Sequence, residues 1–172
     1  MADVAATDSI TFVESMTMEI SSVPLIYGSI AGADRYFSEV LYGQLWSLTS
    51  LERKNKALVQ ATRMLESLPF YGNKAEETQA LSFPRNSLTV TPVEVEQATY
   101  ELANALLKGA DAETERRQLF VKSRKFGRIQ TDFDWANGVP EHIVAGIPCL
   151  EAWRLIRPYL SPNLSLTLRR GS

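Results

Sequence analysis

The stretch Thr49 to Pro69, TSLERKNKALVQATRMLESLP, decides the fold class. Its apolar residues recur at the spacing of one helix face. These residues are Leu51, Leu58, Ala61, Leu65 and Leu68. The spacing of Thr49 and Glu52 predicts a capping box at the start of this helix, and Pro69 cannot continue it. The residues that the helix leaves to solvent are Arg53, Lys54 and Lys56.

Three further helices are predicted around this one. The first covers residues 33–41, with Ser29 as its N-cap. The next begins at a second capping box, Thr91 to Glu94, and ends before Gly109. The last runs from Pro148 to about residue 160. Residues 110–117 are predicted to be a charged linker.

The pattern changes between residues 119 and 135, LFVKSRKFGRIQTDFDW. Aromatic and β-branched residues alternate with polar ones there, and Gly127 is a natural bend, so a β-hairpin or two extended arms are predicted. The chain is therefore expected to be mainly α, a small bundle of about four helices with an extended arm and flexible termini. Its parts are an N-terminal arm (1–24), a helical domain (25–160) that includes the extended segment 119–135, and a C-terminal tail (161–172).

The composition argues against an enzyme. The chain has 172 residues, 45% of them hydrophobic, with one cysteine, one histidine and a net charge of −2. Cys149 and His142 are too few for a thiolate or histidine metal cluster, and no glycine-rich phosphate loop occurs. We therefore expect no catalytic, cofactor-binding or metal site. No signal peptide or membrane-spanning run is apparent either.

Six cations crowd into thirteen residues, with Phe120 and Phe126 between them. They are Arg116, Arg117, Lys122, Arg124, Lys125 and Arg128. Three interpretations stay open: a surface for nucleic acid, a solvated hairpin whose charges protect an edge strand, and a subunit interface. For the interface, the acidic stretch 111–115 of a neighbouring subunit would supply the opposite charge.

The stretch Gln79 to Ser87, QALSFPRNS, separates two helical patterns. Pro84 keeps Phe83 out of helical geometry, so the chain must turn here. We interpret Phe83, Pro84 and Arg85 as a joint between helices, in which Phe83 fills a gap and Arg85 stays available to an acidic group or a neighbouring subunit.

Six motifs in order resemble those of a phage protein family labelled DnaT-like single-stranded DNA-binding protein, which itself resembles the head-to-tail adaptors (connectors) of tailed bacteriophages. The motifs lie in segments 29–37, 56–65, 79–85, 92–107, 120–127 and 148–160. Glu66 stands where the family usually has aspartate, and Phe83 where it has tryptophan.

This resemblance implies a structural virion protein of the phage neck, made in the host cytoplasm. It implies a homo-oligomeric ring of about twelve subunits that docks beneath the portal protein, meets a stopper or tail protein, and surrounds packaged DNA without a membrane partner. The tail residues that would contact portal or tail proteins are Leu164, Leu166, Leu168, Arg169 and Arg170. The alternative is a single-stranded DNA-binding accessory protein that uses the basic cluster.

Overall fold

The computed structural model describes residues 25–119, 123–126, 129–132 and 139–162. Its elements are α1 (Ile30–Glu39), α2 (Gln44–Leu48), α3 (Leu51–Glu66), α4 (Val93–Leu107), α5 (Ala112–Leu119), β1 (Ser123–Phe126), β2 (Ile129–Asp132), α6 (Glu141–Val144), α7 (Leu150–Ile156) and the 3-10 helix η1 (Arg157–Tyr159). The described chain is therefore mainly helical, as predicted.

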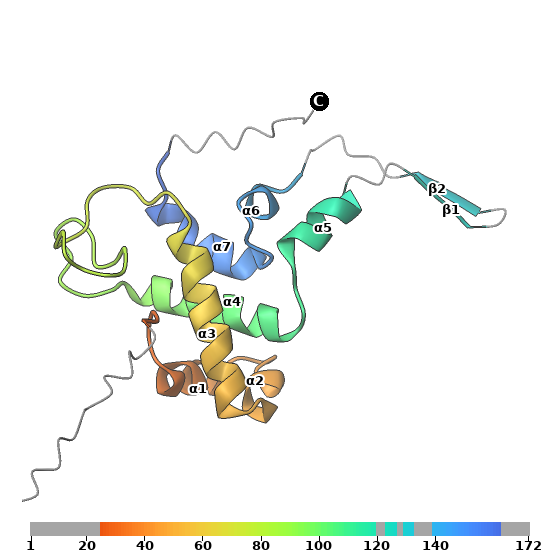
Figure 1. The fold of residues 1–172 in the computed structure, drawn as a ribbon. Coiled ribbons are helices and arrows are strands. Elements are labelled where there is room, and N and C mark those ends of the chain that lie inside the picture. The colour runs from red at the N-terminus through yellow and green to blue at the C-terminus, as the bar shows by residue number, and fades with distance from the viewer. Residues whose placement is uncertain (1–24, 120–122, 127–128, 133–138, 163–172) are drawn as a thin grey trace, which may run out of the picture.

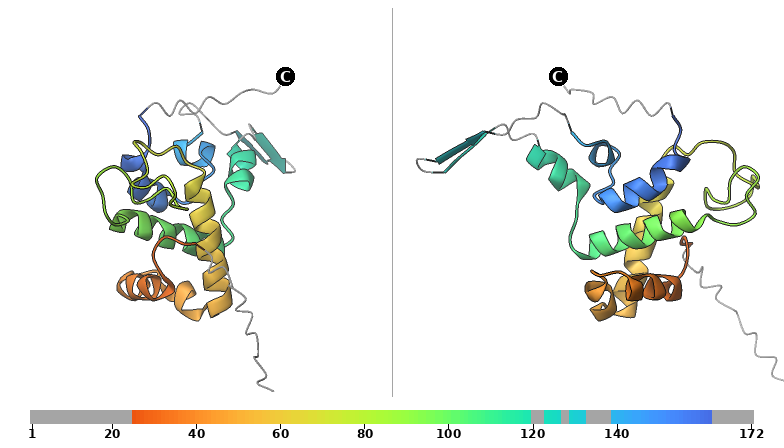
Figure 2. Two further views of the ribbon diagram at one scale, coloured as in Figure 1. Left: turned by 60° about the vertical axis from the view of Figure 1, so that its left-hand side comes forward. Right: turned by 180° about the vertical axis from the view of Figure 1, so that it is seen from behind.

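Helix α4 lies at the centre of the packing, between α3 and α7 (Figures 1 and 2). Helix α3 crosses α4 and α7 on one side, and α1 and α2 pack at the end of the molecule where α3 begins. Helices α5 and α6 contact each other, and α6 lies between α5 and α7 in Figure 1. The helices thus form a compact bundle around two long members.

The apolar stripes of α3 and α4 form the core. Leu58, Ala61 and Leu65 of α3 are fully buried, as are Val95 and Leu102 of α4. Each of the buried leucines and the valine contributes about 1.5–3 kcal/mol through burial of apolar surface. Ser29 is the N-cap of α1, with its Oγ accepting from the Gly32 N–H at 3.0 Å. The Ser29 cap was correctly predicted, as was the burial of Leu58, Ala61, Leu65 and Leu68. Leu51 was wrongly placed on the buried stripe, since it is 69% exposed.

Both predicted capping boxes are wrong. The N-cap of α3 is Ser50, without a side-chain hydrogen bond, and the Thr49 hydroxyl donates back to the Leu45 carbonyl at 2.7 Å. A short helix, α2, ends at Leu48, so Thr49 belongs to its C-terminus. Pro92 is the N-cap of α4, where no side chain caps the helix.

The structure also contains three short helices that the sequence patterns did not predict: α2, α5 and α6. The predicted charged linker is helical from Ala112 onward, because Asp111 accepts hydrogen bonds from the N–H groups of Glu113 and Thr114 at 3.2 Å each. The count of about four helices was therefore too low.

Strands β1 and β2 pair antiparallel, with Ser123 opposite Asp132 and Phe126 opposite Ile129. The residues that join and flank them, 120–122, 127–128 and 133–138, lie outside the described part of the chain. The predicted extended arm over 119–135 therefore remains a prediction. So do the predicted N-terminal arm and the part of the C-terminal tail beyond residue 162.

Candidate functional site

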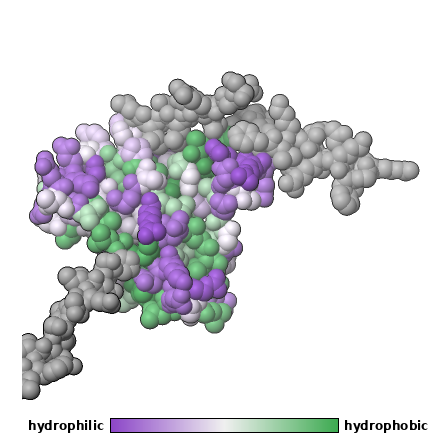
Figure 3. Space-filling view, viewed as in Figure 1, coloured by the Kyte–Doolittle hydropathy of each residue, from purple (hydrophilic) through white to green (hydrophobic). Residues whose placement is uncertain are grey.

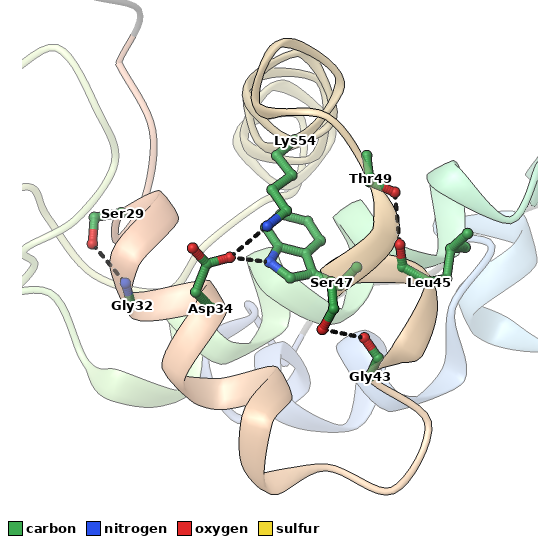
Figure 4. Close-up of polar contacts among 9 residues, drawn as sticks. Ser29, Gly32, Asp34, Gly43, Leu45, Ser47, Thr49 and Lys54 are labelled. Carbon is green, nitrogen blue, oxygen red and sulfur yellow. Dashed lines mark hydrogen bonds and ion pairs between the residues drawn. The ribbon is translucent and has the colours of Figure 1, made fainter.

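Three helices meet at the carboxylate of Asp34 on α1 (Figure 4). Its Oδ1 accepts from the Trp46 indole N–H at 2.7 Å and from the Lys54 ammonium at 2.8 Å. The Lys54 ammonium also lies 5.4 Å from the centroid of the Trp46 ring. Hydrogen bonding from Lys54 lowers the pKa of Asp34, and the Trp46 N–H acts in the same direction. The prediction that Lys54 is left to solvent is wrong, since its side chain is only 11% exposed.

The segment between α3 and α4 is centred on Phe83, which is buried. The rings of Tyr27, Phe70 and Tyr159 meet it edge to face, with centroids 5.9, 4.8 and 5.5 Å away. The peptide bond between Phe83 and Pro84 is cis. Phe83 thus joins the start of the described chain, the end of α3 and the C-terminal 3-10 helix.

Arg85 does not stay available to an acidic group, and that prediction is wrong. It is 9% exposed, and its guanidinium donates to the carbonyls of Tyr71 (3.1 Å), Ser82 (3.3 Å), Phe70 (3.3 Å) and Gly72. Three of these carbonyls belong to residues 70–72, near the start of the loop between α3 and α4, and the fourth belongs to Ser82. Arg85 therefore links parts of the loop through hydrogen bonds to its backbone, and all of these bonds lie within one subunit.

Glu66 at the end of α3 holds the same loop. Its carboxylate accepts from the Tyr27 hydroxyl and from the N–H of Ser82 at 3.0 and 3.1 Å. Burial raises the pKa of Tyr27, and the neighbouring Glu66 carboxylate raises it further. The motif residues Asp34, Glu66 and Arg85 therefore stabilise the bundle, and each forms its hydrogen bonds within its own chain.

The basic cluster is described only in part. Arg116 binds Glu113 at 2.7 Å and Arg117 binds the same carboxylate at 3.2 Å, both within α5. The acidic stretch thus pairs with these cations inside one helix. Lys122 and Arg128 lie outside the described residues, and for Arg124 and Lys125 the structure places the backbone in β1. Five predicted tail contacts also lie outside them: Leu164, Leu166, Leu168, Arg169 and Arg170.

A second basic surface lies on α3 and was missed in the sequence. Arg53, Lys56, Gln60 and Arg63 share one exposed face, at helical spacings of three and four residues. Figure 3 shows a hydrophilic stripe over α3 with hydrophobic residues on both sides. The signal for this surface in the sequence is the spacing of its cations at one helical face.

An apolar hollow of about 250 Å³ lies beside this stripe. It is lined by Arg53, Lys56, Ala57, Gln60, Leu106 and Leu107. A second hollow, of about 350 Å³, lies between α3, α5 and α6 and shares Gln60 and Leu106 with the first. We call the two together the α3 groove. The cations that line it are Arg53 and Lys56 in the first hollow and Arg116 in the second.

The residues with catalytic potential are engaged in structural contacts. His142 Nδ1 lies 2.8 Å from the Ile147 carbonyl, and burial raises the pKa of the Cys149 thiol. Glu94 accepts from the Tyr159 hydroxyl at 3.0 Å, and Glu101 from the Tyr36 hydroxyl at 2.8 Å. Among the described residues, His, Cys, Asp and Glu side chains form no group of three that could hold a metal. No helix in that part of the chain is long and apolar enough to cross a membrane.

No curated protein and no solved structure matches the chain. One family profile matches residues 26–171, which covers the helical bundle and the basic cluster. The chain therefore belongs to the family described as "Putative DnaT-like ssDNA binding protein".

Proposed function

We propose that the protein binds single-stranded DNA. The observation that carries this proposal is the match of residues 26–171 to a family described by that activity. The cations of the basic cluster, with Phe120 and Phe126 between them, supply the residue types that neutralise phosphates and stack on bases. The net charge of −2 means that binding has to come from such a local patch.

Titration of a labelled oligonucleotide of about 30 nucleotides at several salt concentrations tests this proposal. Affinity should fall as salt rises, with a slope in log K against log salt of about −0.7 for each phosphate contacted. A duplex of the same sequence serves as the control and should bind more weakly. If the full-length protein shows no binding at low salt, the proposal is wrong.

A second candidate is a subunit of the phage head-to-tail adaptor. The observation that favours it is an apolar corner formed by the turns on either side of α2, at one end of the molecule (Figure 1). Its side chains are Leu41, Tyr42, Leu48 and Leu51, with exposed fractions of 84, 74, 85 and 69%. Exposed apolar and aromatic side chains that gather at one place are typical of protein interfaces.

In this second proposal the protein forms a cyclic ring, of about twelve copies, in which one face of a subunit meets a different face of the next. The ring joins the portal to a stopper or tail protein, and DNA passes through it. Light scattering and electron microscopy, with and without portal protein, test the proposal. A protein that stays monomeric and never joins the portal would exclude this role, whatever the oligonucleotide titration gives.

A further inference from the structure

The α3 groove has apolar walls and a cationic edge. Leu106, Leu107 and Ala57 line the first hollow, and its only charged lining residues are Arg53 and Lys56. In Figure 3 hydrophobic residues lie next to the hydrophilic stripe over α3. Such a recess suits a partner that brings apolar side chains together with carboxylates.

The charged residues around the groove differ in whether they have an ion-pair partner among the described residues. Lys56 binds Glu52 at 2.5 Å, whereas Arg53 and Arg63 form no ion pair with any residue that the structure describes. The two carboxylates in the second hollow are already engaged. Asp111 caps α5 through Thr114, and Glu113 binds the two arginines that follow it in the helix. The charge left over along α3 is therefore positive.

The N-terminal segment of this chain has the complementary composition. Residues 1–24 contain four carboxylates, Asp3, Asp8, Glu14 and Glu19, and no lysine or arginine. Every second residue from 10 to 20 is apolar, apart from Glu14. In extended chain these residues would lie on one side: Ile10, Phe12, Glu14, Met16, Met18 and Ile20.

We propose that residues 10–20 bind in extended form along the α3 groove. The apolar row packs against Leu106 and Leu107, and Glu14 pairs with Arg53. The reach is sufficient, because Tyr27 is held on α3 by Thr62 at 3.2 Å and the stretch from Glu14 to Tyr27 spans up to about 43 Å when extended. A helix of the length of α3 measures only about 24 Å. This inference does not depend on whether the protein binds DNA.

Photo-crosslinking of the full-length chain tests this binding. A benzophenone amino acid replaces Phe12, and mass spectrometry maps the crosslinked peptides. The crosslinks should fall within residues 53–64 and 104–112, which form the groove. Arg53→Glu should lower their yield at least fivefold, and the added exchange Glu14→Lys should restore it. Arg35→Glu on α1 makes the same charge change on another exposed surface and should leave the yield unchanged.

The size of the crosslinked product tells which copy supplies the segment. A product of monomer mass means that the segment covers its own groove, and one of dimer mass means that it reaches a neighbour. Crosslinks that map to other surfaces, or that form equally well in the Arg53→Glu variant, overturn the proposal. Circular dichroism of each variant confirms that it is folded, which is expected because Arg53 and Arg35 are exposed.

Discussion

Arg85 carries its charge inside the loop between α3 and α4, where backbone carbonyls surround it. A lysine at this position has one ammonium group and cannot reach carbonyls on both sides at once, so Arg85→Lys leaves several buried acceptors unpaired. We expect this variant to lose about 2–3 kcal/mol of unfolding free energy. Urea denaturation followed by circular dichroism measures it.

Arg154→Lys is the matched control for Arg85→Lys. Arg154 is exposed on α7 and binds Glu151 at 2.9 Å, its one ion-pair partner among the described residues, in a pair of the kind that contributes little to stability. Its replacement should change the unfolding free energy by less than about 0.5 kcal/mol. Equal losses in the two variants would contradict the role given to Arg85.

Asp34 makes the stability of the bundle depend on pH. Its pKa in the folded chain is lowered, because Lys54 and Trp46 donate to the charged form. A group with a lowered folded pKa stabilises the protein above its unfolded pKa, about 3.9, and loses this contribution as pH falls through the folded value. The stability advantage of wild type over Asp34→Asn should therefore be full near pH 6 and shrink below about pH 4.

Urea denaturation at several pH values, followed by tryptophan fluorescence, measures this advantage. Glu39→Gln on the exposed end of α1 is the control, since no hydrogen bond or ion pair of the Glu39 carboxylate occurs among the described residues. An advantage over Asp34→Asn that stays constant from pH 6 to pH 3 would show that the charge of Asp34 is not what matters.

At the scale of the element, the arginines of α5 form ion pairs within their own helix. Glu113 binds both Arg116 and Arg117, so these arginines reach phosphates only in competition with a carboxylate of the same helix. If single-stranded DNA contacts α5, Glu113→Gln should raise the affinity about two- to fivefold at low salt and steepen its salt dependence. Oligonucleotide titrations at two salt concentrations measure both effects.

Glu151→Gln is the matched control for Glu113→Gln. Glu151 forms the same kind of pair, three residues apart, with Arg154 on α7. Because α7 lies outside the basic cluster, the affinity should not change. Equal increases for the two variants would point to net charge alone, and an unchanged affinity for Glu113→Gln would exclude α5 from the DNA-binding surface.

Helices α3 and α4 were predictable because an apolar stripe repeats over four turns in each. Burial of this stripe in the core then stabilises both helices. Helix α5 has no such stripe, yet its acidic first turn and basic last turn are the charge order that favours a helix. This charge order favours a helix, so the prediction of a linker at residues 110–117 left out an available signal. The burial of the Arg85 side chain was not predictable. Its carbonyl acceptors at residues 70–72 are distant in the sequence and come close to the guanidinium only in the folded loop.

At the scale of the whole molecule, the apolar corner around α2 distinguishes an assembly subunit from a monomeric binding protein. Leu48 is 85% exposed, so Leu48→Asp should fold normally and be soluble. If the corner is an interface between copies, this variant should shift the wild-type oligomer towards monomer in sedimentation velocity at micromolar concentration.

Val90→Asp is a matched control for Leu48→Asp, since Val90 is 71% exposed and lies in the segment before α4, away from the corner. Wild-type protein that is monomeric throughout, or an oligomer that survives Leu48→Asp, would rule out the corner as an interface. The motif residues could not have predicted whether the corner is an interface. Those that the structure describes stabilise the interior of the bundle and carry no information about its outer surface.

The closed loop around Arg85 protects the peptide bond after this residue from trypsin. Trypsin cuts after arginine and lysine, and residues 67–92 contain no helix or strand longer than a single bridge, so the loop would be expected to be cut readily. The bond after Arg85 is nevertheless shielded, since the side chain that trypsin must bind is buried among carbonyls. Native-state digestion should therefore spare Arg85 while it cleaves after exposed Lys74, and the rate of cutting after Arg85 reports how often the loop opens.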